Sequence, residues 1–116
     1  MQPEDKDPAY LWDMLQAARE VEAMLEDNDL ATFLSSTILL RATERCVEII
    51  GESARRVSAT YRDKHPEIPW RIIIGQRNIL AHEYGQIDHE LLYKTAVDDI
   101  PELIGLLQVL LPPEKD

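Results

Sequence analysis

The chain has 116 residues, which is enough for one domain and too few for two. It carries 12 Lys and Arg against 22 Asp and Glu, and the resulting net charge of −10 excludes a general basic coat for nucleic acid. Its single cysteine excludes a disulfide framework and a multi-cysteine metal site. Because the first residues are polar and no apolar run is long enough to span a bilayer, we expect no signal peptide. We expect a soluble, cytoplasmic protein that forms a single domain over residues 1–116.

The charge is unevenly distributed along the chain. Residues 1–35 carry a net charge of −7 and residues 85–116 a net charge of −5, whereas residues 36–84 carry +2. Eight of the twelve basic residues lie in this middle stretch, so an anionic ligand would bind there. Acidic ends can also simply keep a small protein soluble. Composition does not distinguish this interpretation from an anion-binding middle stretch.

Apolar residues recur with helical spacing along the whole chain. A first helix is predicted to begin at Asp7 as its N-cap, with Pro8 at the first helical position, and to stop at residues 26–29. Its apolar positions form a narrow seam suited to packing against another helix. These positions are Leu11, Met14, Ala18, Val21 and Leu25.

A second helix is predicted to begin between Leu30 and Ser36 and to end near Tyr61. Its apolar face consists of Leu39, Ala42, Cys46, Ile49, Ile50 and Val57. A second stripe on this helix is polar and consists of Arg41, Arg45, Glu48, Glu52 and Arg55. Side chains three apart on a helix can pair, which predicts Arg45 with Glu48 and Glu52 with Arg55.

The remainder of the chain predicts a loop and two more helices. The prolines predict a loop over residues 62–69, after which Pro69 opens a third helix that reaches Tyr84, with Gly85 as its C′ residue. A fourth helix begins at Asp88 as N-cap, is kinked by Pro101 and ends at Pro112-Pro113. Its apolar residues are Leu91, Leu92, Ala96, Val97, Ile100, Leu103, Leu107 and Leu110. Four main helices with short connections predict an all-α, up-down helical bundle.

The third predicted helix carries four polar side chains among apolar neighbours. At 100° per residue, Asn78 and His82 lie one turn apart, and Arg77 and Tyr84 lie two turns apart on one line. Burying such a patch without partners costs free energy. The patch therefore either lines a cleft or faces the polar stripe of the second helix.

These residue types suit the cleavage of an RNA backbone. The guanidinium of Arg77 can hold a phosphate with two hydrogen bonds, and His82 can transfer a proton near neutral pH. Asn78 can orient His82. No acidic cluster with metal-ligand spacing lies beside His82 in the sequence, which disfavours a metal mechanism. Four such residues on one helix can also be structural hydrogen-bonding groups, and spacing alone leaves both interpretations open.

The segment Arg-Asn-Ile-Leu-Ala-His-Glu-Tyr at residues 77–84 resembles the R-x4-H-x-Y motif of HEPN-domain toxins of the HepT group. Residues 49–54 are similar to the helix-two signature of that family, and residues 68–75 are similar to the lead-in to its motif helix. Ile87-Asp88 and residues 100–103 also match, so the resemblance extends over about residues 10–110. The short motif alone is weakly specific, whereas the ordered set of blocks is strongly specific.

The resemblance implies an all-helical homodimer that acts as a metal-independent endoribonuclease and as the toxin of a type VII toxin–antitoxin system. It implies Arg77 and His82 as the catalytic pair, with Asn78 in support. Its partner would be MntA, a minimal nucleotidyltransferase antitoxin that transfers AMP from ATP to the motif tyrosine, which is Tyr84 here. The substrate would be RNA, either tRNA or messenger RNA, and no cofactor, metal, DNA or membrane is expected.

Four residues of the second helix are candidates for a supporting polar face. Glu48 and Glu52 are expected to pair with arginines, and a further role in holding Arg77 is open. Dimerisation would concentrate arginines from two chains if they share a face, which would help a protein of net charge −10 to bind RNA. The four candidates are Arg41, Arg45, Glu48 and Glu52.

Other residues have simpler interpretations. His65 and His89 are expected at the surface, and Cys46 is expected to be a small core residue. Trp12 and Trp70 are expected to make packing or dimer contacts, with base stacking as the alternative. The alternative function is a catalytically silent HEPN subunit that serves as partner and substrate of a nucleotidyltransferase. A purely structural helical dimer is the third possibility.

Overall fold

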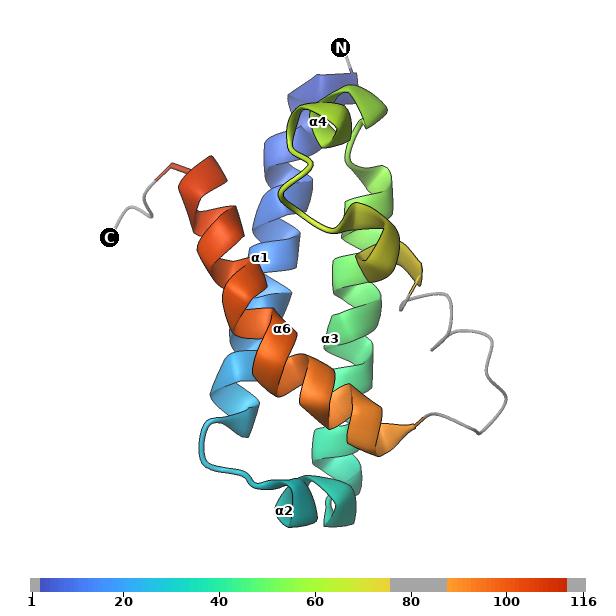
Figure 1. Cartoon of the computed structure of the whole chain (residues 1–116), viewed down its shortest axis with the longest axis vertical. Helices are drawn as coiled ribbons and strands as arrows, with labels where there is room; N and C mark the ends of the chain where they lie inside the picture. Colours follow the sequence, from blue (N-terminus) through green and yellow to red (C-terminus); the bar gives the residue numbers. More distant parts are fainter. Residues whose placement is uncertain (1–2, 76–87, 113–116) are drawn as a thin grey trace.

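The structure is a computed structural model, and it describes residues 3–75 and 88–112 (Figure 1). These residues form helices and no strand, which confirms the predicted all-α fold. A 3-10 turn, η1, covers Pro3–Lys6, and residues 70–75 are helical. The other helices are α1 Asp7–Leu25, α2 Leu30–Ser35, α3 Thr37–Arg56, α4 Ala59–Lys64 and α6 His89–Leu110.

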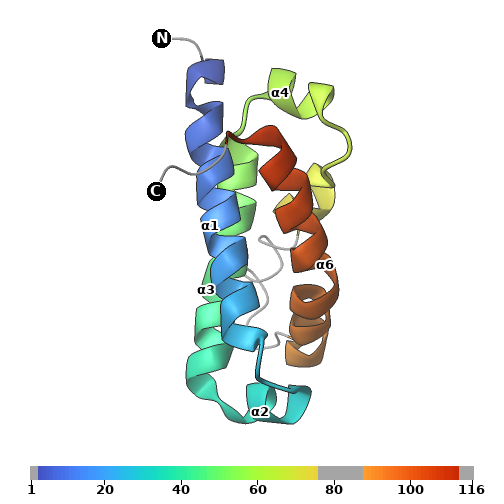
Figure 2. The same ribbon diagram turned by 90° about the vertical axis from the view of Figure 1, so that its left-hand side faces the viewer.

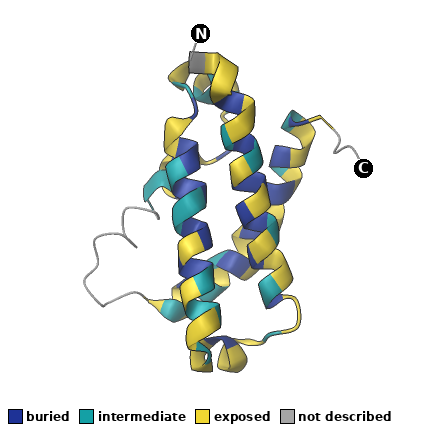
Figure 3. Cartoon of the chain, turned by 180° about the vertical axis from the view of Figure 1, so that it is seen from behind, coloured by how far each residue is buried: buried dark blue, intermediate teal, exposed yellow. Residues whose placement is uncertain are grey.

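The longest helices are arranged around α1. Helix α1 runs in one direction, α3 returns beside it, and α6 crosses obliquely on another side (Figures 1 and 2). Helix α1 packs against both α3 and α6. All five residues of its predicted seam are buried, and so are Leu15 and Ala17 beside them. The buried face is wider than predicted because α1 has two packing partners (Figure 3).

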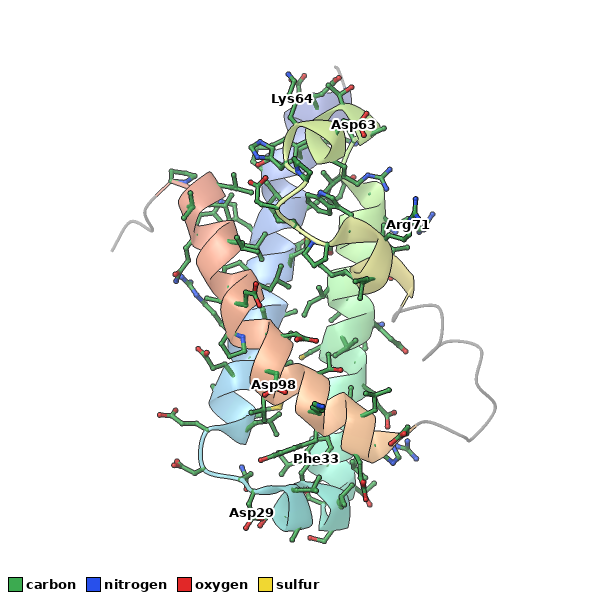
Figure 4. The ribbon with its side chains drawn as sticks, in the orientation of Figure 1. Asp29, Phe33, Asp63, Lys64, Arg71 and Asp98 are labelled. Carbon is green, nitrogen blue, oxygen red and sulfur yellow. The ribbon has the colours of Figure 1, made fainter. Side chains whose placement is uncertain are left out.

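The start of the second helix was predicted between Leu30 and Ser36, and a separate short helix, α2, fills this range before α3 begins. Asp29 caps α2, with its Oδ1 accepting from the N–H of Thr32 at 2.8 Å. Ser36 then leaves the helical conformation and caps α3, with its Oγ accepting from the N–H of Leu39 at 3.2 Å. Helix α2 closes one end of the bundle, because Phe33 is fully buried with its ring 5.3 Å from that of Tyr93 on α6 (Figure 4).

The predicted end of the second helix near Tyr61 is wrong. Helix α3 ends at Arg56, Val57 is extended, and Ser58 caps the separate short helix α4. Residues 62–64, predicted as loop, belong to α4, so the loop is confined to residues 65–69. A serine that can accept from the N–H three residues later competes well with continuation of a helix.

The buried face of α3 is also rotated from the predicted one. Cys46, Ile50 and Val57 are buried as expected, whereas Leu39, Ala42 and Ile49 are only half-buried. Their places in the interior are taken by Thr43, Glu44, Val47 and Ala54. The position of α1 decides which face of α3 is covered, and helical spacing alone does not specify it.

Asp7 does not cap the first helix. Helix α1 begins at Asp7 itself, and Lys6 occupies the N-cap position without a side-chain bond. The Asp7 carboxylate is 1% exposed and accepts from the N–H of Ser58 at 2.8 Å and from its hydroxyl at 2.7 Å. The Ser58 hydroxyl oxygen also accepts from the N–H of Tyr61, so one contact connects the starts of α1 and α4.

Helix α6 begins as predicted. Asp88 is its N-cap, accepting from the N–H of Leu91 at 3.0 Å. Pro101 lies inside the helix, and the bend expected there stays a prediction. Leu111, which precedes Pro112, is extended and ends the helix. Leu91 and Val97 were expected in the apolar face, but they are 59% and 44% exposed.

Cys46 is a core residue, as predicted. Its thiol donates to Oε2 of Glu20 on α1 at 3.6 Å. Burial, reinforced by the neighbouring Glu20 carboxylate, raises the pKa of the Cys46 thiol to about 11. The thiol is therefore protonated and unreactive at neutral pH.

In the part of the chain that the structure describes, no helix combines the length and apolar character required to cross a membrane.

Replacing Asp7 by Ala should lower the free energy of unfolding by about 3 kcal/mol, because the partly buried N–H and hydroxyl of Ser58 lose their acceptor. Urea unfolding followed by circular dichroism measures this loss. The control is Asp13→Ala at an exposed position of the same helix, which should change the free energy by no more than about 0.5 kcal/mol. Equal losses in the two variants would contradict the structural role of Asp7.

Cys46 should react slowly with a thiol reagent in the folded protein. A pKa raised from 9.0 to about 11 reduces the thiolate fraction near pH 8 by about 100-fold, and the fraction recovers as the pH rises toward 11. The rate of reaction with dithiobis-nitrobenzoate should therefore be at least about 100-fold lower in the folded protein than in concentrated urea. Similar rates in both states would show that the thiol is accessible and ionised.

Candidate functional site

The motif residues lie outside the part of the chain that the structure describes. These residues are Arg77, Asn78, His82 and Tyr84, together with the predicted helix end at Gly85. The structure does describe the chain that leads into the motif, the start of α6 that follows it, and the polar stripe of α3.

The lead-in to the motif is held by Trp70. Its Nε1 donates to the backbone oxygen of His65 at 2.9 Å, and its ring meets the ring of Tyr61 edge-on. Ile68 and Ile73 on either side of it are buried, which fixes where the helical residues 70–75 begin. Trp70 is itself buried, in agreement with the packing role predicted for it. Arg71, the next residue, points away from the bundle (Figure 4).

The four candidates for a supporting polar face all lie on α3. Arg41 and Arg45 are exposed over 69% and 66% of their side chains, and Glu48 and Glu52 are about one-third exposed. Arg45 and Glu48 form the predicted pair at 3.7 Å. Such an exposed pair contributes little to stability, so Arg45 remains available to an anion.

The pair predicted between Glu52 and Arg55 is wrong. Glu52 accepts from Arg56 at 2.8 Å instead. Both spacings bring side chains together on a helix. Glu52 uses the four-residue spacing, and Arg55 is exposed.

A hydrogen bond between Glu44 and His89 was not predicted. Oε2 of Glu44 lies 2.7 Å from Nε2 of His89, and the two residues are 45 positions apart. Oε1 of Glu44 accepts from the guanidinium of Arg41 at 3.3 Å. The Glu44 side chain is 12% exposed and that of His89 is 31% exposed. His89 was expected at the surface, and the structure places it partly buried against α3.

Sequence reasoning had one usable signal for this cluster. Glu44 stands three residues after Arg41 and four before Glu48, so it continues the polar stripe. The position of His89 after the Asp88 cap gave no indication of a partner, because spacing along the chain does not report contacts between distant helices.

The arrangement leaves one nitrogen of His89 available. When Nε2 donates to Glu44, the neutral ring has an acceptor at Nδ1. Nδ1 has no hydrogen-bond partner among the residues that the structure describes. A carboxylate, an imidazole and a guanidinium therefore meet where the chain leaves the motif and enters α6.

His65 and Trp12, which the sequence analysis also considered, lie away from the Glu44–His89 contact. His65 contacts Glu67 at 3.1 Å in the loop before Trp70, and its ring stacks on Tyr61. The pKa of the Glu67 carboxyl is lowered. The first cause is a hydrogen bond from the backbone N–H of Glu67 itself, and the second is the hydrogen bond with His65. Trp12 is partly buried against the core, which agrees with a packing role.

An apolar cavity of about 180 Å³ lies between α3, α6 and residues 70–75. Its walls include Val47, Ile50, Ile72 and Leu103, and it does not include the polar stripe. Such a lining suits an apolar group and not a phosphate. Among residues 3–75 and 88–112, no group of three or more His, Cys, Asp or Glu is placed to hold a metal ion.

Comparison with known proteins identifies relatives over most of the chain. The sequence profile of the family described as "Ribonuclease HepT-like" matches residues 14–110. This range includes the motif segment, the polar stripe and both members of the Glu44–His89 pair. No solved structure gives a significant match.

Three curated relatives illustrate the similarity. The chain is 38% identical over 95 residues to "Putative RNase MJ1380" of Methanocaldococcus jannaschii, covering 82% of this chain and 87% of the relative. It is 32% identical over 106 residues to "Putative RNase TTE0752" of Caldanaerobacter subterraneus subsp. tengcongensis, covering 91% and 95%. It is 35% identical over 101 residues to "Probable ribonuclease HepT" of Thermococcus cleftensis, covering 87% and 92%.

Proposed function

We propose, from the premise that this chain belongs to the HepT-like ribonuclease family, that it is an endoribonuclease of the HEPN type. The observation that carries the proposal is the family match over residues 14–110, which includes the complete R-x4-H-x-Y motif at residues 77–84. The names of the relatives describe them as ribonucleases, in agreement with this assignment.

The catalytic pair in this proposal is Arg77 and His82. The ribose 2′-hydroxyl attacks the adjacent phosphorus, the bond to the 5′-oxygen breaks, and His82 transfers the proton. Arg77 holds the phosphate and stabilises the negative charge that develops in the transition state. Asn78, one turn from His82 on a helix, orients the imidazole.

Exposed arginines on α3 support binding of an anionic substrate. Arg41 and Arg45 are largely exposed on α3, within the part of the sequence that carries the basic residues. The overall charge of −10 opposes RNA binding, so affinity has to come from such local cations and should decrease with salt. This mechanism uses proton transfer and a guanidinium and requires no metal.

We further propose that the protein is the toxin of a toxin–antitoxin pair and acts as a homodimer. Its antitoxin would be an MntA-type nucleotidyltransferase that attaches AMP to Tyr84. On a helix, Tyr84 lies on the same line as Arg77, two turns away. The added phosphodiester charge and nucleoside would compete with RNA for Arg77 and fill the site.

The alternative is a catalytically silent HEPN subunit that binds the nucleotidyltransferase and is its substrate. The net charge of −10 is the observation that favours it, because polyanion binding generally relies on excess positive charge. Both functions predict modification of Tyr84, and only the ribonuclease requires His82.

Substitution of His82 by Ala should abolish RNA cleavage and the growth arrest caused by expression in a bacterial host. Loss of a general acid–base group lowers the rate by about 100-fold to 10,000-fold. Growth and total RNA are followed together, and the purified proteins are assayed on total RNA with and without EDTA. Cleavage by the unsubstituted protein should persist in EDTA.

The outcomes of this experiment separate the two functions. If folded wild-type protein neither arrests growth nor cleaves RNA, the silent binding subunit becomes the better assignment. If EDTA stops cleavage, the metal-independent mechanism is wrong and the ribonuclease assignment remains.

Substitution of Tyr84 by Phe should prevent AMP transfer from ATP by the cognate nucleotidyltransferase, because the acceptor hydroxyl is missing. Mass spectrometry of the intact protein measures the number of AMP groups. Tyr10→Phe, at a partly buried position of α1, is the matched control and should leave modification unchanged. Retention of the AMP group in Tyr84→Phe would place the acceptor elsewhere.

A further inference from the structure

We propose that an open groove between α4 and residues 66–72 binds the sugar–phosphate backbone of single-stranded RNA, with Arg62 and Arg71 holding its phosphates. The choice of RNA as the ligand rests on the proposed ribonuclease function, and the groove adds an RNA-binding site outside the R-x4-H-x-Y motif. The inference is carried by the groove itself, by the two arginines that line it, and by the positive charge concentrated at this end of the bundle.

The groove has the size of a ligand site. It has a volume of about 680 Å³ and is open to solvent. Pockets of about 300–1,000 Å³ hold ligands of the size of a nucleotide. Part of its wall is apolar and consists of Pro66, Pro69 and Ile72. Ile72 is 63% exposed, so a base or a ribose can lie against an apolar surface beside the arginines.

Arg62 comes from α4 and has unused hydrogen-bonding capacity. The residue is half-buried, and its Nε is buried without a hydrogen-bond partner among the residues that the structure describes. A buried N–H without an acceptor costs free energy. The side chain is therefore stabilised when it turns toward an acceptor in the groove, and a phosphate oxygen is a strong acceptor for a guanidinium.

Arg71 comes from a second element, the helical residues 70–75. Its side chain is exposed, and within residues 3–75 and 88–112 its guanidinium forms no ion pair. The backbone beside it is fixed, because the neighbouring Trp70 is buried and donates to the backbone oxygen of His65. Two guanidiniums held on separate elements of one groove suit the bidentate contacts that arginine makes with phosphate.

Positive charge is concentrated around the groove. Residues 55–71 carry five Lys and Arg against two Asp and Glu, a net charge of +3, whereas the rest of the chain carries −13. Helix α3 ends in this stretch with Arg55 exposed, and α4 follows at the same end of the bundle (Figure 1). A polyanion that meets this acidic protein is therefore attracted to this end.

Most acidic residues near this end lie outside the groove. Glu67 contacts His65 at 3.1 Å, and Glu52 is paired with Arg56 on α3, and neither acid lines the groove. Asp63 is the one acidic residue in the described lining, and it lies toward the same side of the molecule as Arg71 (Figure 4). Its carboxylate is exposed, so water and salt screen its repulsion of a phosphate.

A nucleic acid strand suits this lining better than an acidic protein segment does. Each phosphate presents two oxygens to a guanidinium, and each nucleotide also has a flat base that can contact Pro69 and Ile72. A positively charged groove combined with a surface for the bases is the usual arrangement for binding a single strand. A run of carboxylate side chains has the charge but lacks the flat apolar part.

The first experiment measures binding of a fluorescent single-stranded RNA of about 12 nucleotides with 2′-O-methyl riboses. Because its blocked 2′-oxygen cannot attack phosphorus, the result does not depend on ribonuclease activity. Arg62→Gln and Arg71→Gln should each lower the affinity by about threefold to tenfold at about 50 mM salt. In the double variant, the slope of log affinity against log salt should become less steep by about 1.4, as expected for two lost phosphate contacts.

Two further variants are the controls. Lys94→Gln removes the same charge from an exposed position of α6 outside the groove and should change the affinity by less than about twofold. Asp63→Asn removes the one carboxylate of the groove and should tighten binding by about twofold. Arg71 is exposed, so Arg71→Gln should leave the thermal midpoint unchanged.

The second experiment measures cleavage of unmodified RNA. The double variant should raise KM by about tenfold and leave kcat within about twofold, as expected for side chains that bind substrate and transition state equally. If the unsubstituted protein binds the 2′-O-methyl strand with the expected effects of the variants but cleaves no RNA, the ribonuclease function is rejected and the RNA-binding groove stands.

Three results would overturn the proposal. Equal affinities in Arg62→Gln, Arg71→Gln and Lys94→Gln would mean that RNA binds through overall charge and not in the groove. A loss confined to Arg62→Gln, with a lower thermal midpoint, would mean that Arg62 only stabilises α4. If polyglutamate binds as tightly as the RNA and loses the same affinity in both arginine variants, the groove recognises an acidic protein segment instead.

Discussion

The burial of α1 between two other long helices is the constraint on which this fold depends. Apolar side chains cover so much of α1 that one partner helix could not remove them all from water. Packing α3 and α6 against the same helix sets the position of these two helices relative to each other. The polar stripe of α3 and the start of α6 thereby become neighbours, although the motif segment separates them in the chain.

Two buried carboxylates then specify the arrangement more precisely than the apolar contacts do. Asp7 accepts two hydrogen bonds from Ser58, and Glu44 contacts His89 and Arg41. Hydrophobic burial tolerates small shifts of a helix, whereas an ionised carboxylate in the interior requires its donors at hydrogen-bond distance. Asp7 connects the start of α1 to α4, and Glu44 connects the middle of α3 to the chain that follows the motif.

The distribution of charge has a consequence for function. The protein is strongly acidic, yet Arg41 and Arg45 project from the same helix that holds Glu44. An acidic protein repels RNA at long range, so a local site must supply the attraction, and that attraction is strongest at low salt. Under the proposed ribonuclease function, this combination predicts RNA binding that is weak and that weakens further with salt.

The sequence by itself determined the helical class, the buried seam of α1 and the cap at Asp88, because each depends on spacing or chemistry within a few residues. The ordered blocks of sequence also indicated the family, which the comparisons confirm. The cap at Ser36 lies within the predicted start of the second helix, whereas the cap at Ser58 begins a new helix before the predicted end near Tyr61. The serine at position 58 is visible in the sequence, but the apolar pattern continues past the end of α3. Only the tertiary structure decided that Asp7 meets Ser58 and that Glu44 meets His89. These partners are 51 and 45 residues apart, and the packing of whole helices, which no local pattern encodes, brings them together.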